Sequence, residues 1–179
     1  MLRTHLREDV ELHLSPKFGS LQREHRVGIR AALKQTLQNL GMESGLERIE
    51  DLSEAPRLPE GSVSISHCRL LGGWAFSATS QRLGLDIEQI ARVRPELALR
   101  MSNQSEMEEA PHPAALWTAK EAAFKFLRGE RQPLTAKEIR VTSWSLTAQG
   151  FYRFSAVYEE EIIPGVSWAQ GDLVWASLC

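Results

Sequence analysis

Two acidic side chains alternate with apolar ones in a short segment of this chain, Gly-Leu-Asp-Ile-Glu at residues 84–88. The apolar character and the alternation predict a strand, in which successive side chains point to opposite faces. Asp86 and Glu88 then point the same way. Paired carboxylates on one face are typical ligands of a hard divalent cation, although a strand end can also carry such residues simply facing solvent.

A second charged segment follows some thirty residues later, Trp-Thr-Ala-Lys-Glu-Ala-Ala-Phe-Lys at residues 117–125. It is predicted to be a helix, in which Trp117, Glu121 and Lys125 share one face because they are spaced four apart. If this helix packs against the strand, three carboxylates and an ammonium converge. Such a set suits Mg²⁺ shared with substrate phosphates. The alternative is an ordinary salt bridge between Glu121 and Lys125.

These two patterns, in this order, resemble those of the 4′-phosphopantetheinyl transferases of the larger, surfactin-synthetase-activating (Sfp) type. That family has a G-[VL]-D-[IV]-E strand end followed by a W-[ST]-x-K-E-[AS]-x-x-K helix, and the chain fits both patterns. Residues 62–67, Ser-Val-Ser-Ile-Ser-His, resemble a third family element, S-[LIV]-S-H. The smaller, trimeric holo-acyl-carrier-protein synthases lack the second acidic residue, so Asp86 with Glu88 favours the larger branch.

The resemblance implies an α+β fold in which two similar lobes are related by a pseudo-twofold axis. Residues 1–179 would form a single domain with lobes at about 1–100 and 101–179, divided within residues 93–109. The implied reaction transfers the 4′-phosphopantetheine arm of coenzyme A to a serine of an apo acyl or peptidyl carrier protein. It depends on Mg²⁺ and releases adenosine 3′,5′-bisphosphate.

The resemblance also implies roles for individual residues. Asp86, Glu88 and Glu121 would hold Mg²⁺. Lys125 would bind the coenzyme A phosphates and offset the charge of the leaving group. Glu121 is also the candidate acceptor of the serine proton, a role that competes with metal binding because a metal-bound carboxylate is less basic.

Further basic residues could bind coenzyme A, and each also has a structural or solvent-exposed alternative. The resemblance places His67 and Lys120 near the phosphates, whereas His67 could be a structural residue at a strand end and Lys120 could be solvated. Arg26, Arg30 and Lys34 recur every four residues and could meet the nucleotide 3′-phosphate, but a solvated basic stripe is the preferred interpretation. Glu106, between the two motifs, also resembles a family position.

Composition limits the remaining possibilities. The 179 residues with 42% hydrophobic content suit one well-cored domain or two small lobes. A net charge of -2 gives no reason to expect nucleic-acid binding. The charged N-terminus and the absence of a long apolar run predict a cytoplasmic protein without membrane contact, and we expect a monomer. Cys68 and Cys179 form no motif for a disulfide framework or zinc site.

Hydrophobic periodicity and the Gly and Pro residues predict an order of elements in which a helix followed by strands occurs twice. A loop is expected at 45–59. The expected helices are 20–40, one that begins at Pro95 and runs through 101 into 109, and 114–127; the expected strands are 62–66, 74–79, 83–87, 139–144, 151–158 and 173–178.

Two other functions stay open at this stage. One is a non-catalytic relative that binds coenzyme A or a carrier protein, and the other is a Mg²⁺-dependent hydrolase of coenzyme A or nucleotide pyrophosphates. The sequence does not identify the carrier protein. Because carrier helices are typically acidic, we expect them to meet arginines such as Arg92, Arg94 and Arg100.

Overall fold

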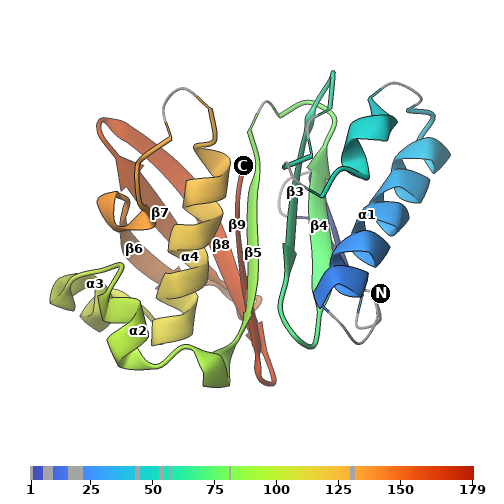
Figure 1. Ribbon diagram of the computed structural model, residues 1–179. Coiled ribbons are helices and arrows are strands. Elements are labelled where there is room, and N and C mark those ends of the chain that lie inside the picture. Colours follow the sequence, from blue (N-terminus) through green and yellow to red (C-terminus); the bar gives the residue numbers. More distant parts are fainter. Residues whose placement is uncertain are drawn as a thin grey trace. The chain divides into compact units, whose positions relative to one another are not determined.

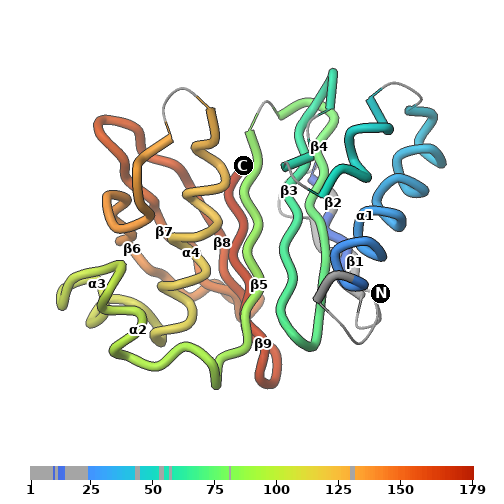
Figure 2. Tube along the Cα trace, viewed as in Figure 1, coloured from blue at the N-terminus to red at the C-terminus, as the bar shows by residue number. Residues whose placement is uncertain are grey.

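The computed structural model of the chain describes residues 2–5, 10–15, 22–42, 45–52, 55–56, 58–80, 82–129 and 132–179 (Figure 1). The chain divides into two compact units, Met1–Leu83 and Gly84–Cys179. The sequence predicts a division near residue 100. It comes earlier because strand β5 (Gly84–Gln89) pairs antiparallel with β9 (Leu173–Leu178), side by side in Figure 2, and therefore belongs to the sheet of the second unit.

The first unit contains an antiparallel sheet and one long helix, α1 (Gln22–Asn39). The sheet order is β1-β2-β4-β3, and the strands are β1 (Leu2–His5), β2 (Val10–Ser15), β3 (Ser62–His67) and β4 (Gly72–Ser77). Ile29, Leu33 and Leu37 of α1 are fully buried and share a core with residues of β3 and β4. The predicted helix and two strands are confirmed in this unit, and β1 and β2 are additional.

The basic stripe of α1 is solvated only in part, since Arg26 is exposed as the preferred interpretation expects and Lys34 is half-buried. Its three cations contact residues at and after the 3-10 helix η1 (Leu46–Ile49): Arg30 donates to the carbonyl oxygens of Ile49 (2.7 Å) and Asp51, Arg26 donates to that of Leu52, and Lys34 pairs with Glu50 at 2.8 Å. Arg30 is buried. The stripe therefore attaches this segment to α1.

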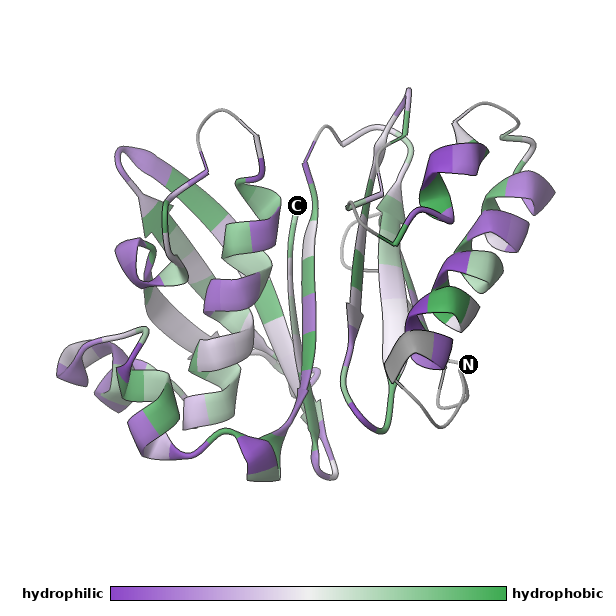
Figure 3. Ribbon diagram, viewed as in Figure 1, coloured by the Kyte–Doolittle hydropathy of each residue, from purple (hydrophilic) through white to green (hydrophobic). Residues whose placement is uncertain are grey.

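The second unit is a five-stranded antiparallel sheet covered by α4 (Pro113–Phe126), as Figure 1 shows. The sheet order is β5-β9-β8-β7-β6, with β6 (Arg140–Leu146), β7 (Tyr152–Tyr158) and β8 (Glu161–Gln170). Along β5 the hydropathy alternates, as the sequence predicts (Figure 3). Each unit thus combines helix with antiparallel sheet, as expected for an α+β fold. No helix in the described part of the chain has the length and apolar character needed to cross a membrane.

The helix expected from Pro95 into residue 109 is instead two short helices, α2 (Pro95–Leu99) and α3 (Gln104–Glu109). Asn103 separates the two helices, because its backbone is extended and its side chain caps the N-terminus of α3. Its Oδ1 accepts from the backbone N–H of Glu106 at 3.0 Å, and Glu106 Oε2 accepts from the Asn103 N–H at 3.1 Å. This reciprocal capping box fixes where α3 begins.

Candidate functional site

Helix α4 is positioned by its N-terminal cap and by an alanine-rich buried face. His112 Nδ1 accepts a hydrogen bond from the Ala115 N–H at 3.1 Å, and Pro113 occupies the first helical turn. Burial lowers the pKa of His112 below its usual value, which favours the neutral imidazole that this cap needs. The residues of α4 that are at most 1% exposed are small or aliphatic except for Thr118 and Lys120: Ala114, Ala115, Leu116, Thr118, Ala119, Lys120, Ala122 and Ala123.

Gly84 allows the start of β5 to lie directly against α4. A Cβ atom at this position would be 2.0 Å from the carbonyl oxygen of Ala122, far inside van der Waals contact. The side-chain direction of Gly84 therefore faces α4. Because side chains alternate along a strand, Asp86 and Glu88 share this face. The glycine of the motif thus lets the strand face that carries Asp86 lie close to the helix.

Lys125 connects α4 to β5. Its Nζ donates to Asp86 Oδ1 at 2.7 Å and to the carbonyl oxygen of Leu85 at 2.9 Å. The Lys125 and Asp86 side chains are 15% and 11% exposed, so the charges are partly removed from solvent without being sealed off. A charge-assisted hydrogen bond in this setting is stronger than one on the open surface. The two motifs predicted to converge are joined by this contact.

Glu121 lies one turn before Lys125 and is half-buried. Burial raises the pKa of its carboxyl, the nearby Asp86 carboxylate raises it further, and Lys125 and Arg128 oppose the shift. Two carboxylates that repel each other at neutral pH form a site where a cation is favourable. Asp86 and Glu121 are therefore an oxygen-donor pair that fits a hard divalent cation, with Lys125 beside them.

Glu88 has different partners from the other two carboxylates. Its Oε1 accepts from the Gln89 N–H at 2.8 Å and lies 3.4 Å from Arg92 Nη1. Within the described ranges, no group of three or more His, Cys, Asp or Glu side chains is arranged to hold a metal ion. Asp86 and Lys125 are thus in direct contact, and both act electrostatically on Glu121. The Glu88 carboxylate is instead directed to Arg92. The metal-binding role of Glu88 stays a prediction.

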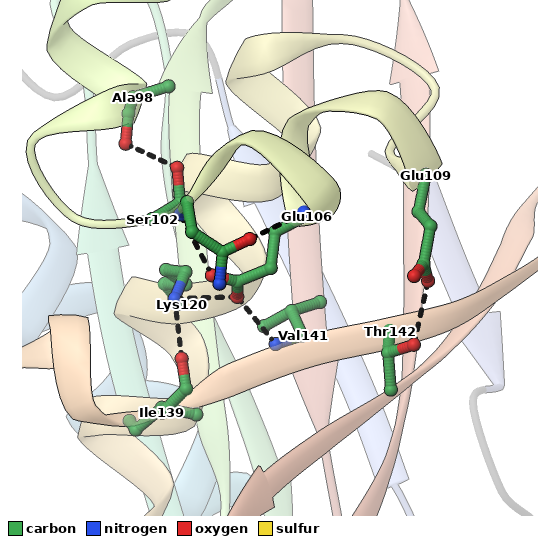
Figure 4. Close-up of polar contacts among 9 residues, drawn as sticks. Ala98, Ser102, Glu106, Glu109, Lys120, Ile139, Val141 and Thr142 are labelled. Atoms are coloured by element: carbon green, nitrogen blue, oxygen red, sulfur yellow. Dashed lines mark hydrogen bonds and ion pairs between the residues drawn. The ribbon is translucent and has the colours of Figure 1, made fainter.

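Lys120 is neither solvated nor directed toward Asp86. It is 1% exposed, and its Nζ forms an ion pair with Glu106 Oε1 at 2.8 Å and donates to the carbonyl oxygen of Ile139, as Figure 4 shows. Burial lowers the pKa of Lys120, while the hydrogen bond and charge of Glu106 act in the opposite direction. Its assignment to the coenzyme A phosphates stays a prediction, and the structure shows its ammonium group in a buried network.

Two residues of structural importance for α4 were not identified as such from the sequence. For Glu106 the sequence indicates only a resemblance to a family position, although the pattern Asn-x-x-Glu at residues 103–106 is a capping-box signature. His112 was not singled out, although it directly precedes a proline that begins a predicted helix. The signal in both cases is a polar residue just before a helix start, Asn103 for α3 and His112 for α4.

His67 is the last residue of β3, pairs with Gly72 of β4, and is half-buried. The strand therefore extends one residue beyond the predicted range of 62–66 and includes His67. His67 belongs to the first unit, whereas Asp86, Glu121 and Lys125 belong to the second. Its contact with coenzyme A stays a prediction.

Residues 82–165, 84 of the 179, match the family model of the 4′-phosphopantetheinyl transferase superfamily. This segment contains β5 and α4 entirely, and thus Asp86, Glu121 and Lys125, whereas His67 precedes it. No curated protein matches the chain. The family match supports phosphopantetheinyl transfer as the general class of reaction, with coenzyme A and a carrier protein as the general substrates.

Proposed function

We propose that this protein transfers the 4′-phosphopantetheine arm of coenzyme A to a serine hydroxyl of an apo acyl or peptidyl carrier protein. The observation that carries the proposal is the contact between Lys125 and Asp86 beside Glu121, all within the segment that matches the family. An ammonium next to two acidic oxygen donors is suited to a pyrophosphate with its metal ion.

We further propose that the protein is of the larger, Sfp-like type, made of two related lobes. Asp86 with Glu88 two residues later supports this assignment. The two-lobe assignment is also supported by the secondary structure of the two units, since each has an antiparallel sheet and one helix of at least fourteen residues. The proposed lobes follow the observed units, 1–83 and 84–179, in place of a division near residue 100.

Mg²⁺ is the proposed cofactor. Asp86 and Glu121 would hold it, with Glu88 as a third candidate that would have to leave Arg92. Burial raises the pKa of Glu121 and repulsion from Asp86 raises it further; the fit rests on this repulsion and on the donor chemistry. When bound, Mg²⁺ would stabilise negative charge on the pyrophosphate oxygens.

The reaction forms a bond between the serine oxygen and the β-phosphorus of coenzyme A and breaks the bond to adenosine 3′,5′-bisphosphate. Negative charge develops on the departing phosphate. Lys125 is positioned to offset this charge because its hydrogen bonds to Asp86 and to the Leu85 carbonyl hold its ammonium at the surface where β5 and α4 pack together. Preorganised charge of this kind needs no rearrangement during the reaction.

The serine proton must be accepted as the new bond forms, and Glu121 is the proposed acceptor. Its raised pKa makes it a stronger base than an exposed glutamate once it is ionised. Metal binding by the same carboxylate would lower that basicity. A water held by Glu121 could transfer the proton in that case.

The test is incubation of the full chain with coenzyme A, Mg²⁺ and an apo carrier protein, followed by intact-mass measurement of the carrier. We expect the carrier to gain one phosphopantetheine group and the product adenosine 3′,5′-bisphosphate to appear in equal amount. Cleavage of coenzyme A without carrier modification would instead indicate a hydrolase. Binding without any cleavage would indicate a non-catalytic relative, and either result would refute the proposed transfer.

Glu121→Gln is the matched variant for the assignment of roles. It keeps the volume of the side chain and removes the negative charge, so transfer should be lost while the fold is retained. Glu109→Gln makes the same chemical change on α3, where Glu109 contacts Thr142 and Ser143 of β6, and should transfer at the wild-type rate. Equal activity of the two variants would remove Glu121 from the mechanism.

A further inference from the structure

We infer that the buried ion pair between Lys120 and Glu106 is a positioning device that sets the rotation of α4, so that Glu121 and Lys125 face Asp86. The inference deepens the proposed function and rests on it for its catalytic consequence. Lys120 and Glu121 are neighbours on the helix, about 100° apart around its axis. One therefore points into the protein interior while the other points to the candidate site.

The ion pair and hydrogen bond of the Lys120 ammonium group are directional and buried away from solvent. The side chains of Lys120 and Glu106 are 1% and 6% exposed, and their charged atoms are 2.8 Å apart. Lys120 also donates to the carbonyl oxygen of Ile139, which directly precedes β6 (Figure 4). A displacement of this ammonium would leave a buried carboxylate without its partner, which is strongly unfavourable.

Glu106 is itself held by three hydrogen-bond donors. Its Oε1 accepts from Lys120 and from the Val141 N–H at 2.9 Å, and its Oε2 accepts from the Asn103 N–H at 3.1 Å. Asn103 in turn caps α3 through the Glu106 N–H. The carboxylate therefore ties Lys120 both to the first turn of α3 and to strand β6. Figure 4 shows Lys120 and Val141 directed toward the Glu106 carboxylate.

The rest of the buried face of α4 carries large apolar side chains toward its two ends, at Leu116 and Phe126. Between Leu116 and Phe126 its fully buried apolar residues are Ala119, Ala122 and Ala123. Alanine side chains allow close packing but provide few directional constraints. A rotation of roughly 20° would move side-chain atoms about 6 Å from the helix axis by about 2 Å. Displacements of about 1 Å can lower rates roughly a hundredfold, so the rotation must be fixed.

The double variant Glu106→Gln with Lys120→Met tests this inference because it removes both charges while keeping similar volumes. Replacing a buried ion pair by neutral groups often leaves stability unchanged, whereas removing one partner does not. Glu109→Gln is the matched control. Glu109 lies on α3, as Glu106 does, and accepts from Thr142 Oγ1 at 2.7 Å and from the Ser143 N–H at 3.3 Å, both on β6.

The first readout requires no substrate. Nuclear Overhauser contacts between the Lys125 Hε and Asp86 Hβ protons report the approach of α4 to β5 in the full-length protein. We expect these contacts in the wild type and in Glu109→Gln, and a loss of at least half of their intensity in the double variant. The second readout is transfer: kcat should fall at least tenfold, with the KM for the carrier protein within twofold of wild type.

A folded double variant with wild-type Lys125–Asp86 contacts and wild-type kcat would overturn the inference. If the wild type transfers nothing, the proposed function fails but the contacts between Lys125 and Asp86 still decide this inference. If the double variant does not fold, Glu106→Asp replaces it. That variant keeps both charges and shortens the anchor by one methylene, and we expect weakened contacts and a kcat lowered at least threefold. Unchanged values there would equally refute the positioning role.

Discussion

The N-terminal cap of α4 should make the stability of this helix depend on pH. His112 Nδ1 is the acceptor for the Ala115 N–H, and only the neutral imidazole can accept. Protonation converts this acceptor into a donor. It also places a positive charge at the helix N-terminus, where the helix dipole disfavours it. Acidification should therefore weaken the start of the helix that carries Glu121 and Lys125.

The direction and size of the effect follow from the cap. Because burial lowers the pKa of His112, the unfolded chain binds the proton more tightly than the folded chain. The stabilisation is therefore fully present above about pH 6.5 and is lost as the pH falls through the folded-state pKa. Loss of an N-cap costs about 1 kcal/mol, and an unfavourable charge adds roughly 0.5 kcal/mol. For a chain of this size the sum lowers Tm by about 4 °C.

Thermal melts of the wild type and of His112→Asn from about pH 8 to about pH 4.5 would check this prediction, because the pKa of histidine in the unfolded chain, about 6.5, lies within that range. Asparagine keeps a neutral cap acceptor at every pH. The two melting curves should coincide near neutrality and separate as the pH falls below about 6.5, with the variant more stable. His112→Ala should be less stable than the wild type at neutral pH. Parallel loss of Tm in wild type and His112→Asn on acidification would refute the reasoning.

Three further variants test the candidate site. Glu121→Gln should raise Tm at neutral pH in metal-free buffer, because the raised pKa of Glu121 means that its ionisation opposes folding. The gain in Tm should vanish near the unfolded-state pKa, about pH 4.5. Thermal melts of the variant and the wild type at the two pH values measure this gain. Lys125→Met should abolish transfer and destabilise the chain by about 1 kcal/mol in denaturant titrations, since Asp86 loses its charged donor. Unchanged transfer would exclude Lys125 from the chemistry. Gly84→Ala should cost about 2 kcal/mol in the same titration, because the new Cβ would overlap the Ala122 carbonyl oxygen; a neutral result would show that β5 can move away from α4.

The convergence of Asp86, Glu121 and Lys125 could be anticipated from the sequence because it depends on two local periodicities. Alternation along a strand and the four-residue spacing along a helix place each charged group on one face before any packing is known. The structure adds the contact that joins the faces, from Lys125 to Asp86. Glu88 shows the limit of this reasoning, since the same alternation does not determine that its carboxylate turns to Arg92.

Strand β8 escaped sequence analysis because Pro164 and Gly165 lie in its middle. This dipeptide usually marks a turn. Here Pro164 pairs with Ser155, and Gly165 lies opposite Phe154 within the sheet. A Cβ at Gly165 would be 2.3 Å from the Phe154 ring, so the glycine makes room for an aromatic residue of the core. The requirement for glycine is tertiary, and the local sequence carries no sign of it.

The Lys-Glu dipeptide at residues 120–121 shows how one motif serves two environments. Its charges lie about 100° apart on α4, so the helix can direct only one of them toward β5. The structure directs Lys120 into the buried network of Glu106, while the Asp86 carboxylate acts on the pKa of Glu121. A lysine in this motif need not contact substrate to be required by the reaction. Its interior ion pair can set the helix orientation from which the neighbouring glutamate and Lys125 act.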